Sequence, residues 1–102
     1  MTQDWIVYMI EASDGSLYTG ITTDITRRFR AHLAGKGGAR YFHRGRQPVR
    51  VVYMEGAGDR SAASKREAAI KKLPRSQKLR LVSDLQMRSR YPGLAVLRLM
   101  RR

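Results

Sequence analysis

The chain has 102 residues, of which 21 are Lys or Arg and 8 are Asp or Glu, so its formal charge at pH 7 is +13. This length predicts one small domain with a single core, and the positive excess favours an anionic partner, with nucleic acid ahead of a membrane surface. The absence of cysteine and the presence of only two histidines exclude disulfides and thiolate or poly-histidine zinc sites, so any metal should be a hard ion bound by oxygen. Because no apolar run is long enough to span a bilayer and the N-terminus lacks a signal-peptide pattern, we expect a cytoplasmic protein that does not bind membranes.

Two runs rich in β-prone residues flank the polar break SDGS at residues 13–16, which predicts an antiparallel hairpin. Each run contains a tyrosine, and the length of the loop decides whether Tyr8 and Tyr18 share a face of the sheet. A two-residue loop directs them to opposite faces. A three-residue loop with Gly15 in the left-handed conformation brings Tyr8 opposite Gly20, so both tyrosines share one face and the glycine leaves open space beside the phenol. The sequence leaves both registers open.

The next elements follow from spacing and capping signals. Apolar residues four apart, preceded by the capping candidate Asp24, predict a helix over residues 25–34 that ends at Gly35. The basic, glycine-containing stretch over residues 35–48 is expected to be a loop with at most one helical turn. Residues 49–54 are rich in β-branched side chains and predict a third strand.

The second half of the chain is expected to be mainly helical. Gly56 and its neighbours should break the chain before a helix over residues 61–73, and Pro74 should open another helix, because proline suits the first turn. The order β-β-α-β-α-α predicts an α+β fold with a small three-stranded antiparallel sheet flanked by helices. We expect one domain over residues 1–83 and a basic C-terminal extension over residues 84–102, whose pattern fits either a helix or a strand.

Three further residues are candidates for a site. Arg28 and His32 are four apart and share one face of their helix at the rim of the core. Glu67 lies at the margin of an apolar helix face, in a strongly basic segment. Each has an ordinary structural interpretation as well: a solvated arginine, a helix histidine, and a glutamate paired with Lys71, which contributes only about 0.2–0.5 kcal/mol. Tyrosines are likewise common strand residues.

Taken together, these residues resemble a known family. The matching positions are Ile6-Val7-Tyr8, Tyr18-Thr19-Gly20 about ten residues later, Arg28 and His32 on one helix, and Glu67 on a later one. This pattern is similar to that of the GIY-YIG nuclease domain, particularly its small stand-alone bacterial branch, over roughly residues 4–82. Relatives include the incision domain of bacterial nucleotide excision repair. Some members have an asparagine beyond the glutamate; this chain contains none, and Gln77 is the nearest substitute.

The resemblance implies a metal-dependent endonuclease that hydrolyses phosphodiester bonds of nucleic acid. We expect DNA as the substrate, with RNA left open, and selectivity for structure rather than sequence. Because each chain would carry one site, we expect one nick per site. The resemblance also implies a role for each of six residues: Tyr8 as general base or water-aligning group, Tyr18 in positioning water or phosphate, Arg28 on the scissile phosphate, His32 in tuning Tyr8, Glu67 as ligand of one Mg²⁺ (or Mn²⁺) ion, and Gly20 in keeping the pocket open. Because a phenol has a pKa near 10, its ionised form needs support, which we expect from Arg28, His32 and the metal.

Further basic residues are expected to contact the nucleic-acid backbone: Lys36, Arg40, Lys71, Lys72 and Arg75. Since no base-reading module is recognisable, binding should be largely independent of sequence. We expect a monomer or a weak homodimer. The alternative interpretation is a non-catalytic, basic nucleic-acid-binding module of the same fold.

Overall fold

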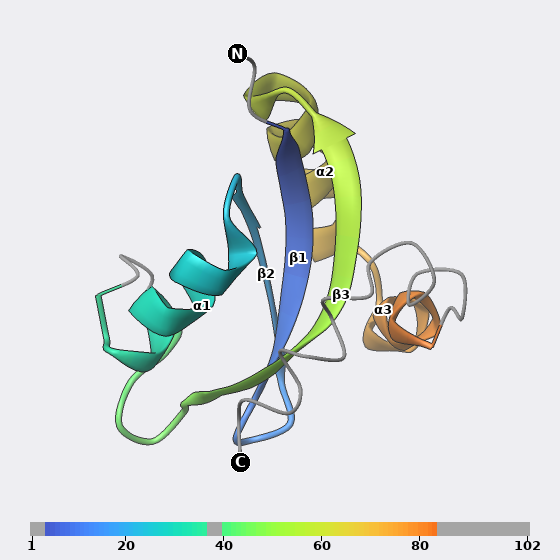
Figure 1. The fold of residues 1–102 in the computed structure, drawn as a ribbon. Helices are drawn as coiled ribbons and strands as arrows, with labels where there is room; N and C mark the ends of the chain where they lie inside the picture. Colours follow the sequence, from blue (N-terminus) through green and yellow to red (C-terminus); the bar gives the residue numbers. More distant parts are fainter. Residues whose placement is uncertain (1–3, 37–39, 84–102) are drawn as a thin grey trace.

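The computed structural model describes residues 4–36 and 40–83, and the expected C-terminal extension over residues 84–102 lies outside the described residues (Figure 1). The elements in chain order are β1 (Trp5–Ala12), β2 (Leu17–Thr22), α1 (Ile25–Leu33), β3 (Pro48–Gly58), α2 (Arg60–Lys71) and α3 (Arg75–Val82). The strands form one antiparallel sheet in the order β2-β1-β3. This confirms the predicted α+β class and element order. None of the helices in the described ranges has the length and apolar composition needed to traverse a lipid bilayer.

The β1–β2 hairpin adopts the three-residue loop. Tyr8 pairs with Gly20, so the two tyrosines face the same side of the sheet. The amide of Ala12 donates to the carbonyl of Ser16 at 2.9 Å, and Gly15 has a φ of +85°. That left-handed conformation is unfavourable by about 1–2 kcal/mol for a residue that carries a Cβ. The turn therefore requires its glycine, and the two-residue register is excluded.

The hairpin turn is tied to the loop that precedes β3. The Nε of Arg46 donates to the carboxylate of Asp14 at 2.8 Å. The amide of Ser13 donates to the carbonyl of Gln47 at 2.8 Å, and the amide of Gln47 donates to the hydroxyl of Ser13 at 3.0 Å. These contacts hold together two segments that lie far apart in the sequence.

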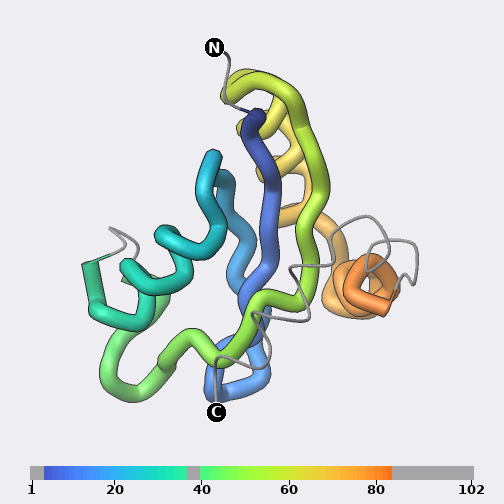
Figure 2. The backbone as a smooth tube through the Cα atoms, in the orientation of Figure 1, coloured from blue at the N-terminus to red at the C-terminus, as the bar shows by residue number. Residues whose placement is uncertain are grey.

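The sheet is covered on both faces, with α1 on one side and α2 on the other (Figures 1 and 2). Successive side chains of a strand alternate between faces, so Tyr8 packs on the side of Phe29 from α1, whereas Val7 and Met9 pack on the side of Ile70 from α2. All five side chains are fully buried. The site candidates in β1 and β2 therefore belong to the α1 side.

Two helices begin at aspartate caps. Asp24 precedes α1, as predicted, and its carboxylate accepts from the amide of Arg27 at 3.1 Å. Asp59 precedes α2 and accepts from the amide of Ala62 at 2.8 Å. Each carboxylate satisfies a backbone donor that the first helical turn leaves free. Pro74 is the N-cap residue of α3 rather than a member of its first turn.

The third strand is longer than predicted. Residues beyond 54 were expected to break the chain, but Gly56 pairs with Ile6 and Gly58 pairs with Trp5, with a register shift between the two pairs. Glycine has a weak intrinsic preference for strands, and here pairing with the start of β1 overrides it. The prediction failed because it used local propensity where a long-range pairing decides.

Substitution of Gly15 tests the turn. No atom lies within 4 Å of the position that a Cβ would occupy, so the loss should come from backbone conformation alone. We expect Gly15→Ala to lower the free energy of unfolding by about 1–2 kcal/mol. Gly15→Asn should lose less, because asparagine tolerates the left-handed region. Denaturant unfolding measures both, and an alanine variant as stable as the wild type would contradict the turn assignment.

Candidate active site

The hydroxyl of Tyr8 and the imidazole of His32 form the centre of the candidate site. The Tyr8 oxygen lies 3.0 Å from Nε2 of His32, and the two residues are 0% and 2% exposed. Tyr18 joins them, with its ring centre 6.2 Å from that of Tyr8 and 5.3 Å from that of His32. The strand register and the last turn of α1 thus bring three of the candidate residues into contact.

Gly20 allows this contact because the ring of Tyr8 crosses β2 at that position. A Cβ built on Gly20 would lie 2.5 Å from the Tyr8 oxygen and 2.7 Å from its Cζ. Any other residue would displace the phenol. The sequence predicted open space beside the phenol at Gly20; in the structure the phenol itself fills that space.

Arg28 lies one turn before His32 on α1. Its guanidinium is close enough to Tyr8 and to His32 to lower the pKa of both. The Nε of Arg28 is buried and has no hydrogen-bond partner among the described residues. A partly buried guanidinium with a free donor is well suited to an anionic ligand.

Glu67 approaches from the opposite side of the sheet, because it belongs to α2. Its carboxylate is close enough to contribute to the raised pKa of Tyr8. It also forms the ion pair that the ordinary interpretation requires, with Oε2 at 3.4 Å from Nζ of Lys71. That pair is partly exposed and contributes at most about 0.5 kcal/mol, so it does not settle the role of Glu67.

A neighbouring ion pair fixes the orientation of α2. Nε and Nη2 of Arg66 donate to the two carboxylate oxygens of Glu55 at 2.8 and 3.0 Å, and the hydroxyl of Tyr53 donates to the same carboxylate. A bidentate pair restricts the rotation of a helix more than a single contact does. Because Arg66 precedes Glu67, this contact also sets the direction in which Glu67 projects.

The protonation states of the central pair follow from burial. Burial raises the pKa of Tyr8 to about 12, and the nearby guanidinium of Arg28, which lowers this pKa, only partly offsets the effect. Burial, with Arg28 as a second cause, lowers the pKa of His32 to about 4. At neutral pH the phenol is therefore protonated and the imidazole is neutral. Arg28 and His32 were both expected to stabilise an ionised Tyr8. Because His32 is neutral, only Arg28 can do so by its charge.

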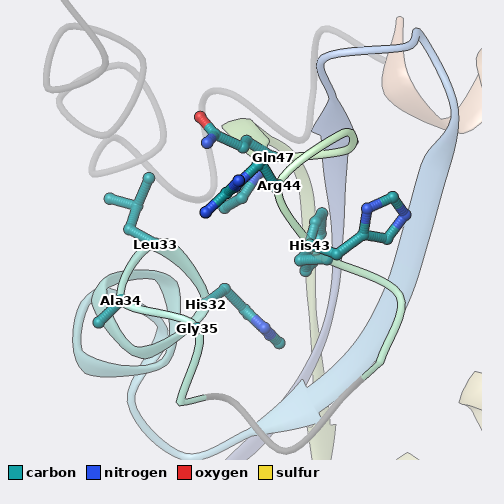
Figure 3. Close-up of a pocket in the computed structure, with 9 residues that line it drawn as sticks. His32, Leu33, Ala34, Gly35, His43, Arg44 and Gln47 are labelled. Atoms are coloured by element: carbon teal, nitrogen blue, oxygen red, sulfur yellow. The ribbon is translucent and has the colours of Figure 1, made fainter.

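Two pockets flank the site. One, of about 200 Å³, lies between the end of α1 and the loop before β3, and Figure 3 shows Arg44 and Gln47 extending from that loop toward α1. The other, of about 330 Å³, lies between the start of β1, the end of β2 and α1. His32 lines the first pocket and Arg28 lines the second, so the catalytic candidates form the boundary between them.

An aromatic pair that the sequence analysis missed covers Tyr18. The ring centres of Tyr41 and Phe42 each lie 5.2 Å from that of Tyr18, and the guanidinium carbon of Arg46 lies 4.4 Å from the Tyr41 ring centre. This stretch was predicted only as a basic loop. Two adjacent aromatic residues within a polar loop were the signal that could have identified it.

The basic candidates are all exposed, and they fall into two groups. Lys36 and Arg40 follow α1, whereas Lys71 and Lys72 lie at the end of α2. Arg75 belongs with the second group, and its Nη2 donates to a carbonyl of the hairpin turn at 3.0 Å. The first group thus follows α1 in the chain, and the second lies at the end of α2 and the start of α3.

Comparison with known proteins identifies the class. Residues 4–80 match the GIY-YIG catalytic domain, so the chain belongs to the GIY-YIG family, whose domain is of the nuclease type. More particularly, its relatives are UPF0213 proteins. UPF0213 protein DP2720 of Desulfotalea psychrophila is 54% identical over 78 residues, which are 76% of this chain and 70% of the relative. UPF0213 protein YhbQ of Escherichia coli K12 is 42% identical over 80 residues, 78% of each chain.

A solved structure is also similar. The solution NMR structure of the UPF0213 protein BH0048 from Bacillus halodurans has 44% sequence identity and a TM-score of 0.49, with 78% of this chain and 83% of that chain covered. The family assignment confirms the resemblance seen in the sequence. The names of these relatives give no substrate and no metal.

Glu67 is the residue of the site that could hold a metal ion. Among residues 4–36 and 40–83, no three His, Asp or Glu side chains gather into a ready-made metal site. Magnesium commonly binds proteins through one or two carboxylates, and water and substrate phosphates supply the remaining ligands. A single carboxylate close to Tyr8, as Glu67 supplies, fits that mode.

The neutral state of His32 predicts how stability depends on pH. In the unfolded chain His32 should titrate near its ordinary value of 6.5, whereas in the fold its pKa is about 4. Between these values the unfolded state binds more protons, so the free energy of unfolding should fall as pH falls, by up to about 1.4 kcal/mol per pH unit. The pKa of Asp14 is also lowered, first by its hydrogen bond from Ser16, but this shift affects the free energy of unfolding only at pH values below this window.

Denaturant unfolding at several pH values measures this slope. His32→Gln should remove most of it. His43→Gln is the matched control, because this second histidine is exposed, and it should keep the slope. Equal slopes in the wild type and in His32→Gln would contradict the neutral, buried imidazole.

Proposed function

We propose that this protein is a metal-dependent endonuclease that hydrolyses phosphodiester bonds of DNA, selects its substrate by structure rather than sequence, and makes one nick per site. The observation that carries the proposal is the hydrogen-bonded pair of Tyr8 and His32 above Gly20, with Arg28 beside it, in a chain of the GIY-YIG family. A phenylalanine would pack equally well at position 8, but it has no hydroxyl to exchange a proton or orient water.

Arg28 binds the scissile phosphate in this proposal. Its guanidinium already lies near Tyr8 and His32, and its buried Nε–H has no partner within the part of the chain that the structure describes. A guanidinium held in place before the substrate arrives stabilises the charge that develops on the phosphoryl oxygens without reorganising. Tyr18, whose ring contacts those of Tyr8 and His32, helps to position the attacking water.

Tyr8 and His32 act as a pair in handling the proton. Because the phenol is protonated and the imidazole is neutral, Tyr8 accepts the proton of the attacking water at its oxygen while its own proton passes to Nε2 of His32. The incoming phosphate favours this transfer, since its negative charge stabilises the imidazolium that forms. His32 is thus the final proton acceptor, and Tyr8 aligns the water and relays the proton.

Glu67 holds the divalent ion, Mg²⁺ or Mn²⁺, through its carboxylate. When bound, the metal supplies Lewis-acid activation of a phosphoryl oxygen and stabilises the leaving oxygen. Lys71, now paired with Glu67, lies close to the ligand position and is free to turn toward the backbone of the DNA. The +13 charge supports binding of the phosphate backbone in general.

Paired variants at Glu67 and Lys71 test the catalytic assignment. Both Glu67→Ala and Lys71→Ala break the same ion pair. Glu67→Ala should abolish nicking yet bind DNA as tightly as the wild type or more tightly, because a negative charge is removed. Lys71→Ala should bind DNA more weakly but keep its single-turnover rate at saturating DNA. If the two variants lost activity alike, Glu67 would serve only as an ion-pair partner.

Tyr8→Phe tests the proton relay with little change in packing. The variant keeps the ring and loses the hydroxyl, so the cleavage rate should fall by at least about a hundredfold. The protein should stay folded but lose about 1–3 kcal/mol of stability, because the buried Nε2 of His32 loses its partner. The assay uses single-stranded, duplex and branched DNA, and RNA, with Mg²⁺ or Mn²⁺. Wild-type protein that binds these substrates but nicks none of them would favour the non-catalytic binding module.

A further inference from the structure

The larger pocket beside the candidate site has the composition of a nucleotide-binding site. Its volume is about 330 Å³, and its lining residues are Trp5, Thr22, Thr23, Arg27, Arg28 and Ala31. One aromatic residue, two hydroxyl-bearing residues and two arginines therefore meet in one concavity. Such a combination of an apolar surface with a few polar groups is characteristic of ligand sites, and this volume lies near the lower end of their usual range.

Trp5 supplies the aromatic surface. It is the only tryptophan of the chain, lies partly exposed at the start of β1, and lines the pocket. The guanidinium carbon of Arg60 lies 5.5 Å from its ring centre, so a cation is already close to the indole. Aromatic side chains next to basic ones are the recurring means by which proteins bind single-stranded nucleic acid.

The two arginines connect the pocket to the proposed chemistry. Arg28 borders Tyr8 and also lines this pocket, and its buried Nε has no partner among the described residues. Arg27 is exposed at the pocket rim, one residue earlier on α1. A strand whose scissile phosphate lies on Arg28 would therefore bring an adjacent nucleotide to Trp5 and an adjacent phosphate to Arg27.

We propose that this pocket binds one unpaired nucleotide next to the scissile phosphate, with its base against Trp5 and its flanking phosphate on Arg27. The proposal rests on the proposed nuclease function and narrows its substrate class. A base inside a duplex is stacked and cannot enter a pocket of this size without leaving the helix. The pocket therefore selects DNA with an unpaired nucleotide at the cleaved position, such as a single strand, a flap or a bulge.

Binding is measured without divalent metal, in EDTA, so that affinity is separated from cleavage. The probes are a short thymidine oligonucleotide and an abasic deoxyribose-phosphate oligonucleotide of equal length, which has the same phosphates but no bases. The thymidine probe should quench the fluorescence of Trp5, which reports on the pocket directly because the chain has no other tryptophan. The abasic probe should quench little.

Measuring the binding of each protein variant to both probes separates base contacts from phosphate contacts. Trp5→Ala should weaken binding of the thymidine probe by about tenfold and leave binding of the abasic probe unchanged, as measured by anisotropy of labelled DNA. Trp5→Phe should retain most of the affinity, because it keeps an aromatic face. If Trp5→Ala weakened both probes equally or neither, a base contact would be excluded.

Arg27→Ala provides a second variant that cannot disturb the core, because its side chain is exposed. It should weaken both probes and reduce the slope of log affinity against log salt by about one. Arg30→Ala is the matched control, because it removes the same charge from an exposed position on the same helix. Arg30 does not line the pocket. Equal effects at Arg27 and Arg30 would mean that only the general charge matters.

A cleavage assay distinguishes the two proposals. If the variants affect the two probes as expected, but the wild-type protein nicks no substrate with Mg²⁺ or Mn²⁺, the proposed nuclease function would be wrong and the proposed nucleotide site would stand. Protein that nicks fully paired duplex as fast as duplex with an unpaired nucleotide, and whose Trp5→Ala variant does not distinguish the probes, would overturn the nucleotide site and keep the nuclease.

Discussion

The left-handed turn at Gly15 is the constraint on which the rest of the site depends. It sets a three-residue loop, and this loop sets the register that brings Tyr8 opposite Gly20. Only there can the phenol cross the edge strand and reach His32. A slip of one residue would turn Tyr18 to the other face of the sheet and separate the aromatic residues. A backbone angle in an exposed turn thus determines a buried contact several residues away.

The parts of the fold that depend on local signals were predictable from the sequence, and the parts that depend on distant partners were not. The cap at Asp24 and the stop at Gly35 were identified because a helix end is a local event. The hairpin register stayed open, because the turn is held by Gln47, which lies 34 residues from its partner Ser13. The far end of β3 was missed for the same reason, since Gly56 is a strand residue only through its pairing with β1.

The site follows the same rule, with a further limit set by electrostatics. The resemblance supplied the identities of the candidate residues, but neither the neutral state of His32 nor the raised pKa of Tyr8 could be deduced from residue types. Both depend on how completely a side chain is removed from water. The aromatic cover of Tyr18 was equally invisible, because contacts across a loop leave no periodic pattern. Burial is a property of the assembled fold, and it changes the proposed roles of the central pair.

Glu67 belongs to α2, which lies on the opposite side of the sheet from α1 and later in the chain. A ribosome releases the chain from its N-terminus, so the hairpin and α1 emerge before α2 does. Arg28, which would bind phosphate, therefore leaves the ribosome before Glu67, which would bind the metal and is positioned only when α2 docks through Arg66 and Glu55. With the roles proposed for these residues, affinity for nucleic acid arises early in synthesis, and the capacity to damage it arises only when the whole domain has folded.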